Sequence, residues 1–374
     1  MFEKMKKAAI ITILDNTNFG TYLQALALAI QVKQVGCEVE VIDYVRPCTS
    51  TKYRLATIKN PFKKLYNAFY GMRKWQQLRR KDHKFLSRFV KFTSRTYHSF
   101  QELKMQPPAA DIYITGSDQV WNSIYNRGID KSFYLDFAPQ NAKRVAYGAS
   151  IGMSKIPREE VKETVELLNK YDTISVREAD AKRILAEIGI ENTTIVLDPT
   201  LLLNADEWKN IAEQYPEIET EPFILVYSVE TDKENSLMEK YASAISKQYD
   251  WKIYEVSYFS YRRRLLFADR HFMQATPDIF LQLMMKAKFV VVSSFHGTAF
   301  AINFNKQFLT IAPNRFNSRV NNILKLCHLE DRMITSTDFI LDDLSPIDYL
   351  PINHILKKER NRSITILHDM LKTT

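Results

Sequence analysis

The feature that constrains this chain most is a series of short apolar runs, each ending in a polar or glycine-containing loop. The first run, KKAAIITIL, is followed by the loop DNTNFG and then by TYLQALALAIQVKQV. In that third stretch Ala25, Leu28 and Val32 recur at helical spacing, and Gly36 stands where a helix C-cap is expected. A second apolar run, CEVEVIDYV, comes next. A strand, a helix and a second strand in this order predict a βαβ unit, and therefore a parallel sheet.

The same alternation continues along the rest of the chain. Further apolar runs are ADIYITG, RVAYGAS, DTISV and TTIVLD in the first half, and PFILVYSV, WKIYEVSYF, KFVVVSS and QFLTIAP in the second. Helix-like stretches such as READAKRILAEIG and SRVNNILKLCHL lie between them. A chain of 374 residues suits two domains of about 150–200 residues each. We therefore expect an α/β protein with two Rossmann-like domains whose parallel sheets face a cleft.

The domain boundaries follow from the same pattern. We expect an N-terminal domain at residues 1–203, with a basic helical insert at residues 52–104. A C-terminal domain is expected at residues 204–345. Residues 346–374 are expected to form a terminal helix after Pro351.

The net charge of +9 is concentrated in one segment. Residues 52–104 hold fifteen Lys and Arg against Asp82 and Glu102, a local balance of +13, with aromatic residues such as Phe62 and Tyr66 interleaved. Such a segment fits an anionic partner: a membrane surface, a lipid-linked phosphate or nucleic acid. The alternative is a solvated helical face with its aromatic residues toward the core. No zinc-finger, RRM or helix-turn-helix signature supports nucleic acid.

The cysteines and the N-terminus bear on the compartment. Cys37, Cys48 and Cys327 are odd in number and lack metal-type spacing, which favours a reduced cytoplasmic protein without disulfides. No stretch approaches the roughly 18 apolar residues of a membrane span. The N-terminal lysines and apolar residues superficially resemble a signal peptide, but they lack a small-residue cleavage site, so we interpret them as the first core strand.

Polar loops follow several of the predicted strands, at residues 15–20, 116–122, 175–178 and 293–297. In open parallel sheets, ligands bind outside the carboxyl ends of the strands, where helix N-termini point backbone donors at them. A structural protein has no need to load so many strand ends with polar residues. The pattern therefore predicts a ligand site.

The first two loops carry amides and a carboxylate. In DNTNFG, helix capping explains Asn16 and Asn18 about as well as ligand binding does. In GSDQVWN, Asp118 is placed to accept a proton or orient a hydroxyl, and Trp121 can stack on a sugar face. An N-cap aspartate and a core tryptophan are the alternative interpretation.

The other two loops carry an arginine and a histidine. The fork of Arg177 suits a carboxylate or phosphate, although an ion pair with Glu178 on a helix surface is the alternative. His296 can exchange a proton near neutral pH, and Gly297 allows a ligand to approach the backbone. A structural histidine is the alternative here.

Several site classes lack support. The chain has no G-x-G-x-x-G, no G-x-x-x-x-G-K-[ST] and no G-x-S-x-G motif, so dinucleotide, P-loop and α/β-hydrolase sites are not predicted. Its seven histidines are scattered without H-E-x-x-H spacing, and no metal site is expected.

Together these segments resemble the polysaccharide pyruvyl transferase family. The resemblance rests on ITGSDQVWN, ISVRE, LDPTLLL and SSFHG in this order, and it spans nearly the whole chain. It implies a fold similar to that of two-domain GT-B glycosyltransferases. It also implies transfer of an enolpyruvyl-derived group from phosphoenolpyruvate to a sugar, usually as a cyclic ketal on a surface polysaccharide. Phosphoenolpyruvate would be a co-substrate, and no cofactor is implied.

The resemblance also implies roles for particular residues. His296 and Arg177 would contact the anionic donor, His296 would also be a candidate proton donor, and Asp118 would accept a hydroxyl proton. The candidate donor-binding residues, on the C-terminal side except for Arg177, are Arg177, Ser293, Ser294, His296, Gly297, Arg262, Arg263, Arg264 and Arg319. The candidate acceptor-binding residues, on the N-terminal side, are Asn16, Asn18, Gly20, Gly116, Ser117, Asp118, Trp121 and Asn122.

One departure from the family pattern concerns the last motif. Many members carry Arg in an S-x-R-x-H-type motif, where this chain has Ser294 or Phe295. We expect Arg262, Arg263 or Arg264, or else Arg319, to supply the missing charge; the alternative is that the donor differs.

Two other functions remain open on the same architecture: a GT-B glycosyltransferase that uses a nucleotide sugar, and a non-catalytic saccharide-binding subunit. The expected partners are phosphoenolpyruvate and a saccharide acceptor, lipid-linked at the inner membrane face. The basic segment would then touch an anionic membrane surface, and no nucleic-acid partner is expected.

Overall fold

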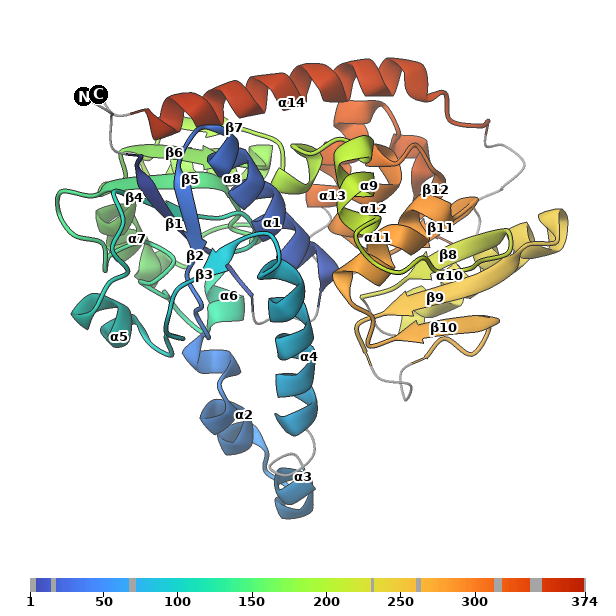
Figure 1. Cartoon of the computed structure of the whole chain (residues 1–374), viewed down its shortest axis with the longest axis horizontal. Coiled ribbons are helices and arrows are strands. Elements are labelled where there is room, and N and C mark those ends of the chain that lie inside the picture. The colour runs from blue at the N-terminus through green and yellow to red at the C-terminus, as the bar shows by residue number, and fades with distance from the viewer. Residues whose placement is uncertain are drawn as a thin grey trace. The chain divides into compact units, whose positions relative to one another are not determined.

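The computed structural model describes residues 5–14, 18–66, 72–229, 232–259, 264–312, 318–336 and 345–372. The chain forms two compact units, each built on a parallel sheet (Figure 1). Unit 1 comprises Met1–Asn16, Thr21–Leu202 and Arg362–Thr374, and unit 2 comprises Thr17–Gly20 and Leu203–Asn361.

The described residues of unit 1 form a seven-stranded sheet in the order β3-β2-β1-β4-β5-β6-β7, and the neighbouring strands pair in parallel. The central strands are buried on both faces, which is why they read as continuous apolar runs in the sequence. The strands are β1 (Lys7–Ile11), β2 (Glu38–Val41), β3 (Lys91–Phe92), β4 (Ile112–Thr115), β5 (Lys143–Ala149), β6 (Thr173–Val176) and β7 (Thr193–Ile195).

Helices connect these strands. Helix α1 (Phe19–Gln34) is buried along most of its length, as its FGTYLQALALAIQ sequence requires. The other helices of the unit are η1 (Pro47–Thr49), α2 (Thr51–Thr57), α3 (Pro61–Tyr66), α4 (Met72–Leu86), α5 (Phe100–Met105), α6 (Ser123–Asn126), η3 (Arg158–Glu160), α7 (Val161–Leu168), α8 (Ala179–Glu187) and η4 (Pro199–Leu201).

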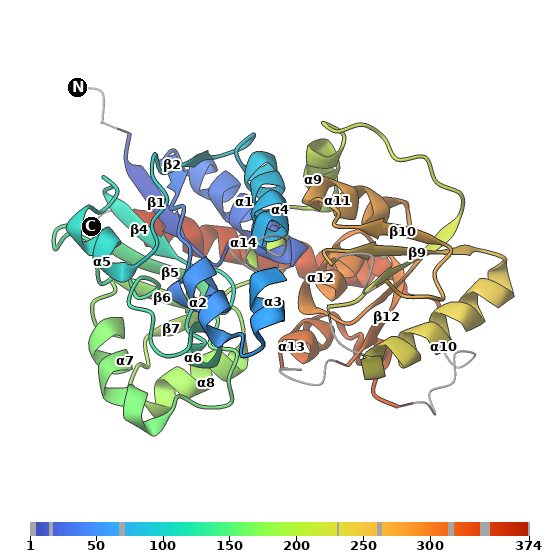
Figure 2. The same ribbon diagram turned by 90° about the horizontal axis from the view of Figure 1, so that it is seen from below.

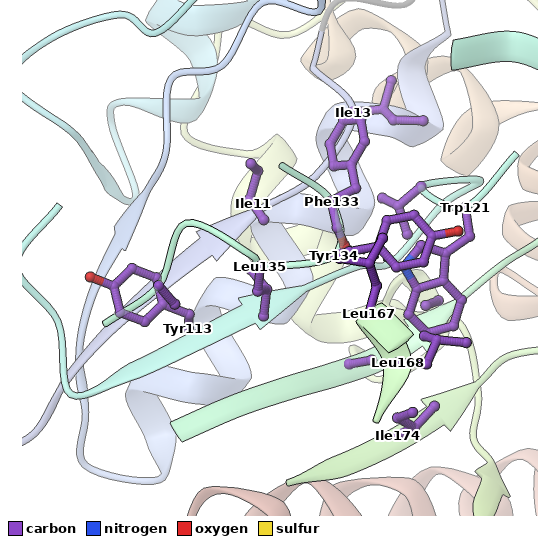
Figure 3. Close-up of a cluster of buried hydrophobic side chains, with 14 of the residues drawn as sticks. Ile11, Ile13, Tyr113, Trp121, Phe133, Tyr134, Leu135, Leu167, Leu168 and Ile174 are labelled. Atoms are coloured by element: carbon purple, nitrogen blue, oxygen red, sulfur yellow. Dashed lines mark hydrogen bonds between the residues drawn. The ribbon is translucent and has the colours of Figure 1, made fainter. Parts of the chain in front are cut away.

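One hydrophobic core cluster of unit 1 joins the sheet to the segments that cross it (Figure 3). Ile11 and Tyr113 come from adjacent strands, and Phe133 and Leu135 come from the segment between β4 and β5. Their side chains are fully buried, so the apolar area removed from water stabilises this region.

The described residues of unit 2 form a six-stranded sheet in the order β10-β9-β8-β11-β12-β13, also parallel. Its order reverses between β8 and β11, as in a doubly wound sheet. The strands are β8 (Phe223–Tyr227), β9 (Lys252–Ser257), β10 (Arg270–Met273), β11 (Phe289–Val292), β12 (Gln307–Ile311) and β13 (Met333–Ile334).

The helices of unit 2 pack in pairs and on the sheet. Helix α9 packs against α11 and α12 against α13, while α10 contacts β8, β9 and β11. Figure 1 shows α9, α11, α12 and α13 gathered beside the sheet. The helices are α9 (Ala205–Ala212), α10 (Asp232–Tyr249), α11 (Pro277–Lys286), α12 (Phe295–Asn303), α13 (Ser318–Cys327) and η6 (Glu330–Arg332).

The division of the chain differs from the expected boundaries in two places. Thr17–Gly20 groups with unit 2, although it precedes most of α1. The terminal helix α14 (Tyr349–Leu371) starts before Pro351, which the first turn of a helix tolerates, and it divides between the units after Asn361. The main boundary, at Leu202–Leu203, lies one residue from the expected position.

The basic segment is not helical throughout. Helices α2, α3 and α4 project from the sheet of unit 1, and in Figure 2 α2 and α3 come toward the viewer (Figures 1 and 2). The chain then returns to the sheet, where Lys91–Phe92 pairs with Glu40–Val41 as the edge strand β3. The expectation of a helical insert over residues 52–104 is therefore wrong for residues 87–99, which include β3, and the chain is helical again in α5 (Phe100–Met105).

Candidate functional site

Polar side chains gather at the carboxyl ends of strands in both units. In unit 1 they follow β4, β5, β6 and β7. In unit 2 they follow β8 and β11. This is the sheet edge at which open parallel sheets bind ligands.

Arg177 is at the centre of the unit 1 group. It comes directly after β6, and its side chain is 1% exposed. Its Nη1 lies 2.6 Å from Asp198 Oδ2, its Nη2 lies 3.3 Å from Asp118 Oδ1, and its Nε lies 3.3 Å from Glu178 Oε2. The carboxylates come from the ends of different strands, so the parallel register of the sheet brings them to one guanidinium.

Burial and charge act on Arg177 in opposite directions. Burial lowers the pKa of the guanidinium, but the charges of Asp198, Glu178 and Asp118 outweigh it and raise that pKa above its usual value. Arg177 therefore stays charged at any pH at which the protein folds. Because its donors already face carboxylates, the geometry gives it the task of holding these acids in place. Its expected contact with the donor stays a prediction.

The carboxylate of Asp118 is held by several donors. Its Oδ1 accepts the backbone N–H of Gln119 at 2.9 Å, and its Oδ2 accepts the Thr21 hydroxyl at 3.3 Å. Its backbone has φ of 69°, a left-handed conformation that aspartate adopts more readily than most residues. These contacts fix the orientation of the carboxylate, and its expected role as a proton acceptor stays a prediction.

Ser117 and Gly116 have structural contacts in the same loop. The Ser117 hydroxyl donates to the Gly148 carbonyl at 2.9 Å and lies 3.2 Å from Asp198 Oδ2. Gly116 has φ of 111°, and a Cβ there would lie 2.3 Å from the Tyr147 carbonyl oxygen. These contacts explain both residues without an acceptor, and their acceptor-binding role stays a prediction.

The structure does not support acceptor stacking on Trp121. Its indole is 3% exposed, donates to the Phe133 carbonyl at 3.2 Å and stacks on Tyr134 in the core (Figure 3). Asn122 is fully buried, and its Oδ1 accepts the Tyr125 N–H at 3.1 Å as the N-cap of α6. Trp121 is therefore a core residue, as in the alternative interpretation of this loop, whereas the N-cap is Asn122 and not the aspartate.

His296 lies in the first turn of α12, at the end of β11, and is 2% exposed. Ser294 is the N-cap of this helix, since its hydroxyl accepts the Gly297 N–H at 3.1 Å. The Ser293 hydroxyl accepts the Val229 N–H at 3.3 Å and lies 3.4 Å from Ser228 Oγ. The end of β11 therefore carries two hydroxyls and the N-terminus of α12, in whose first turn His296 lies.

The imidazole of His296 packs directly on Gly20. A Cβ at Gly20 would lie 2.0 Å from His296 Cγ and 2.1 Å from Nδ1, so only glycine fits there. Gly297 is needed for a different close approach, because its Cβ would lie 2.9 Å from Val292 Cβ. The expectation that Gly297 leaves room for a ligand is therefore not supported, since a core valine occupies that space.

Asn18 connects the same region to β8. Its Oδ1 accepts the Gly20 N–H at 2.9 Å and the Tyr227 hydroxyl at 3.1 Å. The neighbouring Phe19 ring lies 4.9 Å from Phe280 and 5.4 Å from Tyr227. Asn18 and Gly20 were expected on the acceptor side in the N-terminal domain, but their contacts are with unit 2.

The structure brings one of the candidate arginines to the SSFHG segment. The guanidinium of Arg319, on α13, lies 6.0 Å from the centre of the Phe295 ring, next to His296. Arg264 is exposed and is the first described residue of its loop. Asn16, Arg262 and Arg263 lie outside the described residues.

Sequence reasoning missed Asp198 as a member of the unit 1 group. Its Oδ1 accepts the backbone N–H of Thr200 at 2.9 Å, and its Oδ2 pairs with Arg177. A signal existed, because the Asp198-Pro-Thr sequence follows an apolar run as the other polar loops do.

Two other features of the described residues lie outside these groups. A cavity of about 310 Å³ in unit 2 is lined by Lys288, Phe289, Gln307, Trp251 and Arg332. Lys288, Phe289 and Gln307 lie at the amino ends of β11 and β12, opposite the edge where parallel sheets bind ligands. Within the described ranges, no group of three or more His, Cys, Asp or Glu is arranged to hold a metal ion.

Solved structures with a similar fold place the chain in a class. The UDP-GlcNAc 2-epimerase of Methanocaldococcus jannaschii in complex with UDP-GlcNAc and UDP is 13% identical, with a TM-score of 0.53 over 97% of this chain and 99% of that chain. The S. aureus MnaA–UDP co-structure is 12% identical, with a TM-score of 0.52 over 98% of this chain and 91% of that chain. The fold is GT-B-like, with two Rossmann-like domains.

The family follows from the sequence. The model of the polysaccharide pyruvyl transferase family matches residues 18–315, which include the Asp118, Arg177 and His296 loops. The chain belongs to this family. No curated protein sequence matches it.

Proposed function

We propose that this protein transfers an enolpyruvyl-derived group from phosphoenolpyruvate to a sugar of a surface polysaccharide or its lipid-linked precursor, and forms a pyruvate ketal. Family membership supports a pyruvyl transferase in general. The observation that carries the finer proposal is the α12 N-terminus, where Ser294 caps the helix beside His296 and Arg319 lies over the Phe295 ring. Helix N-termini and arginine are suited to the carboxylate and phosphate of such a donor.

The reaction balances without a cofactor. Two sugar hydroxyl oxygens form bonds to the central carbon of phosphoenolpyruvate, and the bond from that carbon to the phosphate oxygen breaks. The methylene carbon gains one proton and becomes a methyl group. The second hydroxyl proton leaves with inorganic phosphate.

The residues divide these tasks. His296 is the candidate donor of the proton to the methylene carbon, because an imidazolium can release a proton near neutral pH. Asp118 is the candidate acceptor of a hydroxyl proton, since Thr21 and the Gln119 N–H fix its carboxylate. Arg177 positions that carboxylate through the 3.3 Å contact between Nη2 and Oδ1.

The proposal also covers the acceptor of the reaction and the cellular location of the protein. The acceptor is a saccharide, lipid-linked at the inner face of the cytoplasmic membrane, and the protein works in the cytoplasm. No helix within the described ranges is long and apolar enough to cross a membrane.

The first test is a thermal-shift titration with phosphoenolpyruvate. A ligand that binds only the folded state at about 100 times its Kd stabilises it by about 2.7 kcal/mol, which raises the Tm by several degrees. We expect this rise in the wild type and in the control His354→Ala, whose histidine is exposed in unit 2. We expect none in His296→Ala.

The outcomes separate three interpretations. If His296→Ala lowers the Tm of the free protein but keeps the full ligand shift, His296 is structural. Stabilisation by UDP-sugars and not by phosphoenolpyruvate would favour a nucleotide-sugar glycosyltransferase, since two proteins of similar fold were solved with UDP or UDP-GlcNAc. Binding of saccharides without phosphate release from phosphoenolpyruvate would favour a non-catalytic subunit.

A further inference from the structure

Helices α2, α3 and α4, within residues 51–66 and 72–86, form an arm that projects from the sheet of unit 1 with α3 at its far end (Figure 1). We propose that this arm docks on an anionic phospholipid bilayer, with the apolar side chains of α3 inserted at the interface. The inference rests on the proposed function in one respect: a lipid-linked acceptor gives the enzyme a reason to meet a membrane.

The charge of the arm is almost entirely positive. Residues 51–86 hold eleven Lys and Arg and a single acidic residue, Asp82, for a net charge of +10. Asp82 is 1% exposed, so it offers no negative charge to solvent. The exposed cations whose side chains are described are Lys59, Lys64, Arg73, Arg80, Lys81 and Lys84. Each basic residue close to an anionic leaflet adds to attraction by its surface potential.

The far end of the arm exposes apolar side chains. Phe62 is 83% exposed, Leu65 is 60% exposed and Tyr66 is 51% exposed. Tyr53, on α2, is 38% exposed. Single exposed apolar residues are ordinary, but a group on one short helix beside basic residues is the pattern of interfacial membrane segments.

The base of the arm is fixed to unit 1. The Arg79 guanidinium pairs with the Asp43 carboxylate. The His83 ring stacks on Phe92 at 3.7 Å, and Phe85 is 3% exposed. These contacts fix the C-terminal part of α4 to unit 1, and α3 lies at the far end of the arm, away from the sheet (Figure 1).

A bilayer fits these observations better than nucleic acid does. Both are anionic, but they differ in what they offer an exposed aliphatic side chain such as Leu65. A phosphate backbone leaves that side chain in water, whereas burial at the bilayer interface removes its apolar surface from water and lowers the free energy. Helix α3 has 6 residues, far fewer than the roughly 20 of a membrane span, so the contact is interfacial.

Vesicle co-sedimentation of the full-length protein tests the proposal. The probe is phosphatidylcholine vesicles with about one third phosphatidylglycerol, compared with phosphatidylcholine alone. The charge variant is Lys59→Glu/Lys64→Glu/Arg80→Glu/Lys81→Glu, and the tip variant is Phe62→Ser/Leu65→Ser. The matched control, Lys155→Glu/Arg158→Glu/Lys162→Glu/Lys182→Glu, makes the same charge change at exposed positions of unit 1 outside the arm.

We expect the wild type and the control to bind the anionic vesicles, and both arm variants to lose at least about tenfold in partition coefficient. No binding by the wild type, or equal loss in the control, would overturn the proposal. So would a tip variant that binds as the wild type does, or preferential binding of single-stranded RNA in the presence of vesicles.

The vesicle-binding result does not depend on the proposed transfer reaction. Phosphoenolpyruvate-dependent thermal stabilisation should be unchanged in both arm variants, because the arm contains none of the donor-site residues. Vesicle binding without that stabilisation would leave the membrane contact intact while the proposed reaction fails.

Discussion

At the scale of single residues, Arg177 shows that a side chain suited to anionic ligands can instead pair with buried carboxylates of the protein itself. A guanidinium with three acidic neighbours, 1% exposed, offers its charge to Asp118, Asp198 and Glu178. The same side chain on a surface would be a plausible phosphate contact. The structural role of Arg177 follows from the carboxylates that surround it at the strand ends.

Arg177→Met should destabilise the protein by about 3–5 kcal/mol, because it leaves buried carboxylates without their cation. Chemical denaturation followed by circular dichroism measures this loss. The control, Arg183→Met, breaks an exposed pair with Glu187 on α8 and should cost about 1 kcal/mol or less. If Arg177→Met folds as stably as the control but loses the phosphoenolpyruvate shift, Arg177 is a donor contact and not a positioning residue.

At the scale of elements, α14 does more than close the chain. Its last part belongs to unit 1, where the Ser363 hydroxyl accepts the Leu197 N–H at 2.9 Å, one residue before Asp198. Leu367 in the same part is fully buried. The helix therefore supports the loop that carries one of the acids around Arg177.

Leu367→Ala should cost about 2–5 kcal/mol, since it removes a buried side chain and leaves a cavity. Leu350→Ala, on the same helix but 80% exposed, should change stability by less than about 0.5 kcal/mol. Urea denaturation of both variants measures the difference. Equal small effects would show that the C-terminal part of α14 adds little to unit 1.

At the scale of the whole molecule, buried groups that hold protons set the response to alkaline pH. Burial raises the pKa of the Cys327 thiol to about 12, and the pKa of the Tyr113 hydroxyl is also raised to about 12, chiefly by burial. Their unfolded-state pKa values are lower, so the unfolded chain releases these protons first. Stability is complete below the unfolded values and is lost as the pH rises toward about 12.

The contribution of the thiol can be separated from that of the tyrosine, because in the unfolded chain a thiol loses its proton at lower pH than a tyrosine hydroxyl does. Between about pH 9 and 10, Cys327 should contribute a fall of about 1.4 kcal/mol in unfolding free energy per pH unit. In Cys327→Ala this contribution disappears, and the pH dependence over that interval becomes shallower. Denaturant titrations at both pH values measure it, with Cys48→Ala as the control for a half-buried thiol. An unchanged slope in Cys327→Ala would contradict this assignment.

Much of the fold was predictable because its signals are local. The buried strands are short apolar runs, and α1 carries its helical period and a glycine at its end. The edge strands β3 and β10 were not predicted, because Lys91–Phe92 and Arg270–Met273 are short, basic and paired on one side only. Their strand character comes from the neighbour and not from their own composition.

The candidate site was predictable only in part. The polar strand ends at Asp118, Arg177 and His296 stand out in the sequence because glycine and polar residues interrupt apolar runs. The burial of Trp121 could not be predicted, because the local sequence around an aromatic residue in a polar loop does not show whether its side chain faces a sugar or the core. The partners of each residue depend on contacts between distant positions.

The sequence by itself determined the alternation of strands and helices, the position of the basic segment and the family, because each depends on neighbouring residues or motif order. Only the tertiary structure decided that Arg177 faces three acids, that Gly20 gives space to the His296 ring, and that Phe62 and Leu65 are exposed on a projecting arm. The physical reason is that strand order and side-chain direction bring together residues far apart in the chain, and no local pattern records which of them meet.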